Sequence, residues 1–162
     1  MHPRIELIPQ KKLVGHVMEM SLVNNKTFVL FSGFMPSRKQ IKHALSANVF
    51  EVMVYDHSYF KNFNPSHPFI KWAALEVSQP ETNDETMQSF VLDEGLYAVF
   101  QYQGLPNEFG MFMNAILTKW LPHSNYNLDD RPHFNVLGDK YKNNDPDSEE
   151  DFISLLSSHG NK

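Results

Sequence analysis

Apolar residues recur with helical spacing between residues 107 and 120. They fall at i, i+3, i+4, i+7, i+8 and i+11, which places them along one face of a helix of roughly four turns. These residues are Phe109, Phe112, Met113, Ile116, Leu117 and Trp120. Pro122 cannot continue this helix. A polar turn at 123–130 then leads to a predicted strand at 134–136.

The earlier part of the chain alternates apolar and polar positions, which predicts strands. The predicted strands cover residues 4–8, 13–20, 49–55 and 69–78, and a last strand covers 151–157. Residues 27–35 predict a helix with Phe28, Phe31 and Met35 on one side, interrupted at Pro36. We expect residues 37–45 to resume as a shorter helical piece.

Short matches between the two halves indicate an internal repeat. Their offsets are 83, 86, 84 and 83 residues, and the matched pairs are Leu13-Val14 with Leu96-Tyr97, Phe34-Met35-Pro36 with Trp120-Leu121-Pro122, Phe50-Glu51-Val52 with Phe134-Asn135-Val136, and Phe69-Ile70 with Phe152-Ile153. The polar segment 79–86 separates the half-repeats, which span about 3–79 and 87–157 of a single domain at 1–162. We therefore predict an α+β fold of duplicated strand-helix-strand-strand modules. It has pseudo-twofold symmetry, an antiparallel sheet with helices on one side, and a central cleft.

The amino-acid composition excludes several classes of protein. The chain has 162 residues, no Cys and a net charge of −5. It shows no apolar run long enough for a membrane span and no leader-like start, so we expect a soluble, cytoplasmic protein. The charge balance argues against direct nucleic-acid binding. The aromatic content of 13% makes an aromatic-lined pocket plausible.

Several segments resemble one family. They are TFVLFSGFMPSRKQI, VMVYD, FIKWAALEVS, GLYAVFQYQG, TKWLPHSNYNLDDRPHFNV and DPDSEEDFISLL, which together extend over about residues 3 to 157. The most specific piece is W-L-P, a polar turn, then R-P-x-F. On these segments the chain resembles the AraC-type effector-binding domain, also called the gyrase-inhibitor-like (GyrI-like) small-molecule-binding domain.

The resemblance implies a binding module for lipophilic, often cationic or aromatic small molecules, held in a cleft between two halves. Some relatives are fused to a helix-turn-helix segment and sense effectors for transcription; because the resemblance extends over almost all of the 162 residues, we expect no such segment here. Standalone relatives have been associated with sequestering toxins, with DNA gyrase inhibition and, in one branch, with hydrolysis of reactive cyclopropane-bearing compounds. The family commonly has Glu after R-P-x-F and Tyr two residues later, where this chain has Asn135 and Leu137.

Nine residues are candidate ligand-binding residues, although each also suits a plain structural role. Asn135 offers an amide to a neutral polar ligand, and Glu51, its repeat-related partner, is the carboxylate that could replace the missing charge. Trp120 could form a pocket wall with Phe31 or Phe34 as its counterpart. The remaining candidates are Tyr55, Trp72, Tyr102 and Phe112. Because Asn135 carries no charge, we expect neutral ligands to be preferred over cations.

No sequence motif specifies catalysis, a metal or a cofactor. The eight His, including His57 and His67 around one loop, lack metal-ligand spacing, and no nucleophile elbow or phosphate-binding glycine loop occurs. We therefore expect binding of a lipophilic small molecule without catalysis. Two alternatives stay open. One is a hydrolase of reactive lipophilic compounds that uses Glu51, Tyr55 or a His as base. The other is a gyrase-inhibitor-type module that binds a protein partner through the acidic segment 145–151.

Overall fold

The computed structural model describes most of the chain. The described residues are 3–56, 58–59, 64–105, 111–112, 115–128, 132–138 and 149–158. Phe109 and Met113 of the predicted long helix lie outside these ranges, as do Tyr141 and most of the acidic segment. None of the helices in the described ranges is both long and apolar enough to cross a membrane.

Nine strands and a few helical segments make up the described structure. The strands are β1 (Arg4–Ile8), β2 (Lys11–Met20), β3 (Ile41–Val54), β4 (Phe69–Thr82), β5 (Gln88–Leu92), β6 (Gly95–Gln103), β7 (Tyr126–Leu128), β8 (His133–Leu137) and β9 (Glu149–Ser158). The helical segments are α1 (Thr27–Ser37), η1 (Arg38–Gln40), η3 (Ile116–Trp120) and η4 (Leu121–His123).

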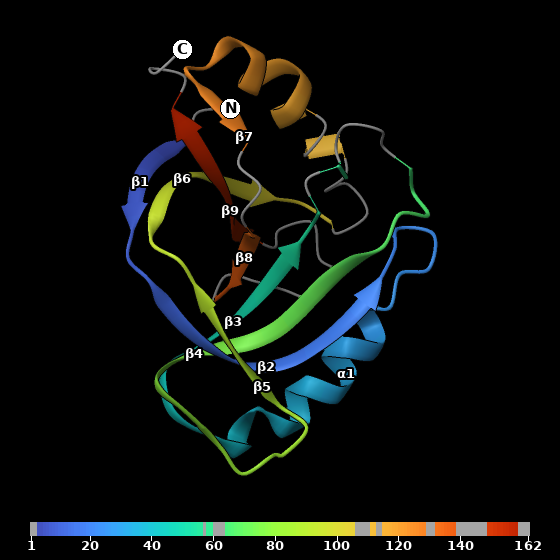
Figure 1. Ribbon diagram of the computed structural model, residues 1–162, viewed down its shortest axis with the longest axis vertical. Helices are drawn as coiled ribbons and strands as arrows, with labels where there is room; N and C mark the ends of the chain where they lie inside the picture. Colours follow the sequence, from blue (N-terminus) through green and yellow to red (C-terminus); the bar gives the residue numbers. More distant parts are fainter. Residues whose placement is uncertain are drawn as a thin grey trace.

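The strands form one strongly curved, antiparallel sheet (Figure 1). Its order is β1-β6-β9-β8-β3-β4-β2-β5, with β7 paired to β9. Strands β8 and β3 lie at the centre, whereas β1 and β5 form the two edges. The central strands are therefore flanked by β4 and β2 on one side and by β9 and β6 on the other.

The two faces of the sheet differ because successive residues of a strand point to opposite sides. The helix-covered face packs against α1 and η3, and its buried apolar residues include Val14, Met20, Leu30, Phe34, Val49, Met53, Phe69, Ala73, Phe100 and Ile116. The apolar face gathers Ile8, Leu13, Phe50, Val52, Trp72, Ala74, Leu92, Tyr97, Val99 and Phe134. Since this second cluster joins both edge strands to the centre, the sheet curls around its apolar face.

Gly15 allows β2 and β4 to approach closely. A Cβ atom at residue 15 would lie 1.9 Å from the carbonyl oxygen of Ala73 and 2.6 Å from the Cα of Ala74. Both of these atoms belong to the backbone of β4, so neither can move aside cheaply. Gly15 is also paired with Gln88 of β5, which fixes it inside a three-stranded region.

The strands predicted at 4–8, 13–20, 49–55 and 69–78 are present, with β3 and β4 longer than expected. The helix at 27–35 is also present, but Pro36 lies within its last turn instead of interrupting it. Only Ser37 follows Pro36 in α1, so the backbone hydrogen bond that proline cannot donate is lost at the end of the helix. The buried residues of α1 are Leu30 and Phe34, while Phe28 is 84% exposed.

The prediction of a helical piece at 37–45 is wrong beyond Gln40. Residues 38–40 form a single 3-10 turn, and β3 begins at Ile41. Ile41 and Lys42 pair with Thr82 and Glu81 of β4, so hydrogen bonding to a distant strand overrides local helix propensity. The same pairing carries β4 to Thr82, into the segment predicted as a boundary.

The region around the predicted long helix is helical where it is described. Residues 111, 112 and 115 are helical, and η3 (Ile116–Trp120) has π-helical hydrogen bonding. At Pro122 the chain tightens into the 3-10 turn η4, so the helix stops where the sequence predicts. The turn predicted at 123–130 contains the short strand β7, and the strand predicted at 134–136 is β8.

Candidate functional site

The two central strands bring Glu51 and Asn135 together. In the antiparallel pairing of β3 with β8, Glu51 lies directly opposite Asn135. Side chains at such positions face the same side of the sheet, and here the Asn135 Nδ2 donates a hydrogen bond to Glu51 Oε1 at 2.8 Å. Both residues point to the helix-covered face, between the strands under α1 and those under η3. The repeat-related pair predicted from the sequence is thus a contacting pair.

Lys71 of β4 completes this group. Its Nζ lies 2.9 Å from Glu51 Oε2, so each oxygen of that carboxylate has a partner. The same ammonium donates to Thr27 Oγ1 at 2.9 Å. Thr27 in turn donates to Asn25 Oδ1 at 2.6 Å, at the start of α1. A chain of polar contacts therefore connects the first turn of α1 to the central strands.

This polar group is almost completely removed from solvent. The side chains of Glu51 and Lys71 are 15% and 11% exposed, and Asn135 is 3% exposed. Asn135 Oδ1 is buried and has no hydrogen-bond partner among the described residues. A buried acceptor left without a donor costs about 1 to 3 kcal/mol. Asn135 Oδ1 is therefore a point where a donor from a bound molecule would be stabilised.

Aromatic rings lie beside this group at the end of β3. The ring of Tyr55 lies 4.5 Å from that of Tyr59, 5.3 Å from that of Phe69 and 5.8 Å from that of His133. Tyr59 in turn meets the ring of His67 at 5.1 Å. Burial raises the pKa of Tyr55 well above the usual range, with smaller contributions from Tyr59 and Glu51. Tyr55 therefore remains a neutral phenol near neutral pH.

A second set of aromatic rings lies under the other helical segment. The ring of Phe100 on β6 meets Phe112 at 6.1 Å and Trp120 at 5.2 Å, both edge to face. Trp120 also stacks on Tyr126 at 6.5 Å. Tyr102 contacts Phe112 at 5.0 Å and donates its hydroxyl to the Leu105 carbonyl. Aromatic surfaces thus flank the central strands on both sides.

The structure brings most of the predicted site residues to one face. Phe31, Tyr55, Phe112 and Trp120 are partly buried against the helix-covered cluster, and Phe34 lies wholly inside it. Trp72 does not join them. It points to the apolar face and packs on Phe90 at 5.0 Å, because it alternates with Lys71 and Ala73 along β4.

Lys71, Tyr59 and His133 are the members of this region that the sequence reasoning missed. Lys71 did carry a signal, since it is the one cation in the mostly apolar strand sequence FIKWAALEV, whose other charged residue is Glu76. Such a residue is rarely buried unless it is paired. His133 and Tyr59 carried no comparable signal, because their burial depends on how the loops and strands meet.

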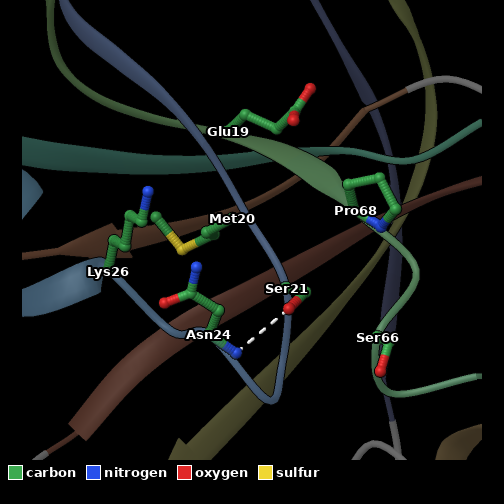
Figure 2. A pocket seen from close by; sticks show the side chains of 7 residues that line it. All are labelled: Glu19, Met20, Ser21, Asn24, Lys26, Ser66 and Pro68. Atoms are coloured by element: carbon green, nitrogen blue, oxygen red, sulfur yellow. Dashed lines mark hydrogen bonds between the residues drawn. The ribbon is translucent and has the colours of Figure 1, made fainter.

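A separate small pocket lies at the turn between β2 and α1 (Figure 2). It has a volume of about 220 Å³ and is lined by Glu19, Met20, Ser21, Asn24, Lys26, Ser66 and Pro68. The backbone N–H of Asn24 donates to Ser21 Oγ at 3.0 Å across it. This lining contains no aromatic ring, so it lacks the stacking surfaces that distinguish the region around Asn135.

The described residues offer no group of three or more His, Asp and Glu that could hold a metal ion. Asp56 instead accepts a hydrogen bond from the ring of His67 at 2.7 Å. This bond, followed by one from Ser58, lowers the pKa of the Asp56 carboxyl. The acidic segment begins outside the described ranges, and its last three residues, 149–151, pair with β6.

A family model for the GyrI-like small molecule binding domain matches residues 1–152. No curated protein matches the sequence. Solved structures similar to this one include SAV2435 bound to tetraphenylphosphonium. Its TM-score is 0.70 at 11% identity, and the match covers 97% of this chain and 94% of that one.

Two further solved structures are similar to this one. The EcmrR C-terminal domain matches with a TM-score of 0.70 at 10% identity, covering 97% of this chain and 98% of that one. A hydrolase from Listeria innocua matches with a TM-score of 0.60 at 12% identity, covering 96% of this chain and 91% of that one. At these identities the likeness establishes a common fold.

Proposed function

The chain belongs to the GyrI-like small molecule binding domain family, and from this membership we propose that it binds aromatic small molecules without net positive charge. The proposed site is the helix-covered face of β3 and β8, between α1 and η3. The observation that carries the proposal is Asn135 Oδ1, a buried acceptor with no partner among the described residues. Ligand sites commonly combine apolar walls with a few polar groups of this kind.

We propose that the site lies at the seam of two duplicated modules. The half at about 3–79 contributes β1, β2, α1, β3 and β4, and the half at about 87–157 contributes β5, β6, the η3 region, β8 and β9. Exchanging β1 with β5, β2 with β6, β3 with β8 and β4 with β9 turns the sheet order into β5-β2-β4-β3-β8-β9-β6-β1. Read from its other end, this is the observed order. Glu51 and Asn135 face each other where these halves meet. This arrangement supports a pseudo-twofold relation.

The net charge of the group formed by Glu51, Lys71 and Asn135 determines which ligands we expect. The similar structure SAV2435 contains tetraphenylphosphonium, a lipophilic cation. In this chain the carboxylate nearest the centre, Glu51, is already neutralised by Lys71 at 2.9 Å, and Asn135 adds no charge. The group as a whole is therefore close to neutral, and a cation gains little Coulomb energy from it.

We propose binding without turnover. A hydrolase acting on this face would need a general base. The Glu51 carboxylate accepts from Asn135 and Lys71 through its two oxygens, and the raised pKa of Tyr55 keeps the phenol protonated. Neither Glu51 nor Tyr55 is arranged to accept a proton from water at neutral pH, so two of the three kinds of base considered for a hydrolase are unsuited to that role, which favours binding.

Two probes of one shape test this proposal. Triphenylmethanol carries a hydroxyl donor, and triphenylethane, with its three rings on one carbon, replaces that hydroxyl with a methyl group. We expect triphenylmethanol to bind about tenfold more tightly, because its hydroxyl satisfies Asn135 Oδ1. Equilibrium dialysis measures both affinities.

Asn135→Leu is the decisive variant, because its side chain has a similar shape without the acceptor. In that variant the two affinities should become equal. Trp120→Ala should weaken both probes, whereas Phe28→Ala, an aromatic change on the exposed side of α1, should leave them as in the wild type. Equal affinities in the wild type, or no binding of either probe, would contradict the proposal.

A further inference from the structure

Lys71 is held in a fixed position beside the Glu51 carboxylate. Its ammonium contacts Glu51 Oε2 and Thr27 Oγ1, both at 2.9 Å, and lies 5.9 Å from the centre of the Phe69 ring. Thr27 is itself bonded to Asn25. Two polar anchors and one aromatic ring therefore hold this cation on the helix-covered face of the sheet, where its side chain is 11% exposed.

These surroundings are those that recognise a lipophilic cation. A carboxylate supplies the opposite charge and aromatic faces attract cations through their quadrupoles. In this chain Lys71 already takes both interactions. A second cation on this face would meet a neutralised carboxylate and the repulsion of the Lys71 ammonium.

We propose that Lys71 is a built-in counter-ion that takes the place of a cationic ligand and makes the domain reject lipophilic cations. This inference rests on the proposed site and deepens it by naming the charge class that the site excludes. Removing the Lys71 charge exposes the carboxylate of Glu51 to a ligand. The specificity of the site then changes from neutral molecules to cations.

The test compares triphenylethane with methyltriphenylphosphonium, its cation of the same shape. We expect the ratio of cation affinity to neutral affinity to rise about tenfold or more in Lys71→Met, because an opposite charge is left without its partner. Lys71→Gln is the second variant, since its amide keeps a hydrogen-bond donor and protects against loss of folding. Thermal denaturation confirms that each variant is folded.

Lys11→Met is the matched control. Lys11 lies 3.5 Å from Glu76 and 5.9 Å from the centre of the Phe50 ring, so it also combines a carboxylate with an aromatic ring. It lies on the other side of the sheet, toward Phe50 of the apolar face, and its loss should leave the ratio unchanged. Adding Glu51→Gln to Lys71→Met should return the ratio to the wild-type level.

The outcomes separate this inference from the proposed function. If triphenylethane binds but the ratio stays the same in both Lys71 variants, the counter-ion role is overturned and the site remains. A rise in Lys11→Met equal to that in Lys71→Met also overturns the counter-ion role. If the wild type and all variants bind none of the probes, the proposed site fails and the inference fails with it.

Discussion

The two faces of the central strands β3 and β8 bury different kinds of side chain. On the apolar face, Phe50 and Phe134 stack with ring centres 5.7 Å apart and Val52 is fully buried. On the helix-covered face, the same strands contribute Glu51 and Asn135. Because the apolar face shows that these strands pack well without polar groups, the fold does not require a charged pair on the other side. Polar groups that folding does not require are candidates for function.

The largest expected effect is on the apolar face. Phe134 is fully buried there and contacts the rings of Phe50 and Tyr97. Phe134→Ala should reduce the free energy of unfolding by about 3 to 5 kcal/mol, through lost burial and the cavity left behind. Urea denaturation measures this change. A loss close to that of the exposed Phe28→Ala would contradict the assignment of this face as core.

A single change on the helix-covered face should have a smaller effect. Glu51→Leu leaves the Lys71 ammonium without its carboxylate and the Asn135 amide without its acceptor. We expect a loss of about 2 to 4 kcal/mol, somewhat below a fully buried pair because both charged side chains retain some exposure. The same urea titration checks this value. Unchanged stability would mean that water replaces Glu51 at both partners.

Replacing the whole polar group should restore most of that loss. The triple variant Glu51→Leu, Lys71→Met and Asn135→Leu replaces all three polar side chains, so none of them remains buried without its partner. Its free energy of unfolding should lie within about 1 kcal/mol of the wild type or above it, since buried ion pairs can often be exchanged for apolar residues. Probe selectivity should be lost. A triple variant less stable than Glu51→Leu would show that the fold itself needs the polar group.

The smallest expected effect concerns the ionisation of Tyr55. Its pKa is raised in the folded protein, mainly by burial, whereas an unfolded tyrosine ionises near about pH 10. The folded state therefore holds this proton more tightly, and the resulting stability is present below about pH 10 and falls as the pH rises above it. Tyr55→Phe should reduce that alkaline loss. Ultraviolet difference spectroscopy should detect no Tyr55 phenolate before unfolding.

Much of the fold could be predicted because its strands are locally patterned. The alternation along β2 and β3 indicates which residues share a face, and the predicted repeat places Glu51 and Asn135, which are in contact, at equivalent positions. The prediction of a helical piece at 37–45 is wrong for a physical reason: Ile41 and Lys42 are held in a strand by their partners in β4, which lie 41 and 39 residues further along the chain. No local pattern contains that information.

The site could be predicted only in part. Periodicity tells that Trp72 and Lys71 point to opposite sides, but it does not tell which side the helices cover. Trp72 was therefore predicted in the site and Lys71 was not. In the same way, Phe28 and Phe31 belong to one predicted apolar side of a helix, yet only the sheet beneath α1 decides that Phe31 is partly buried and Phe28 exposed.

The two tryptophans provide the most direct test of the central claim, because Trp120 packs on the helix-covered face and Trp72 on the apolar face. Nuclear magnetic resonance resolves the two indole N–H signals, and the variant Trp72→Phe assigns them. On titration with triphenylmethanol, the Trp120 signal should shift in proportion to binding while the Trp72 signal stays in place. A shift of Trp72 with Trp120 unchanged would contradict the claim that this domain binds its ligand on the helix-covered face.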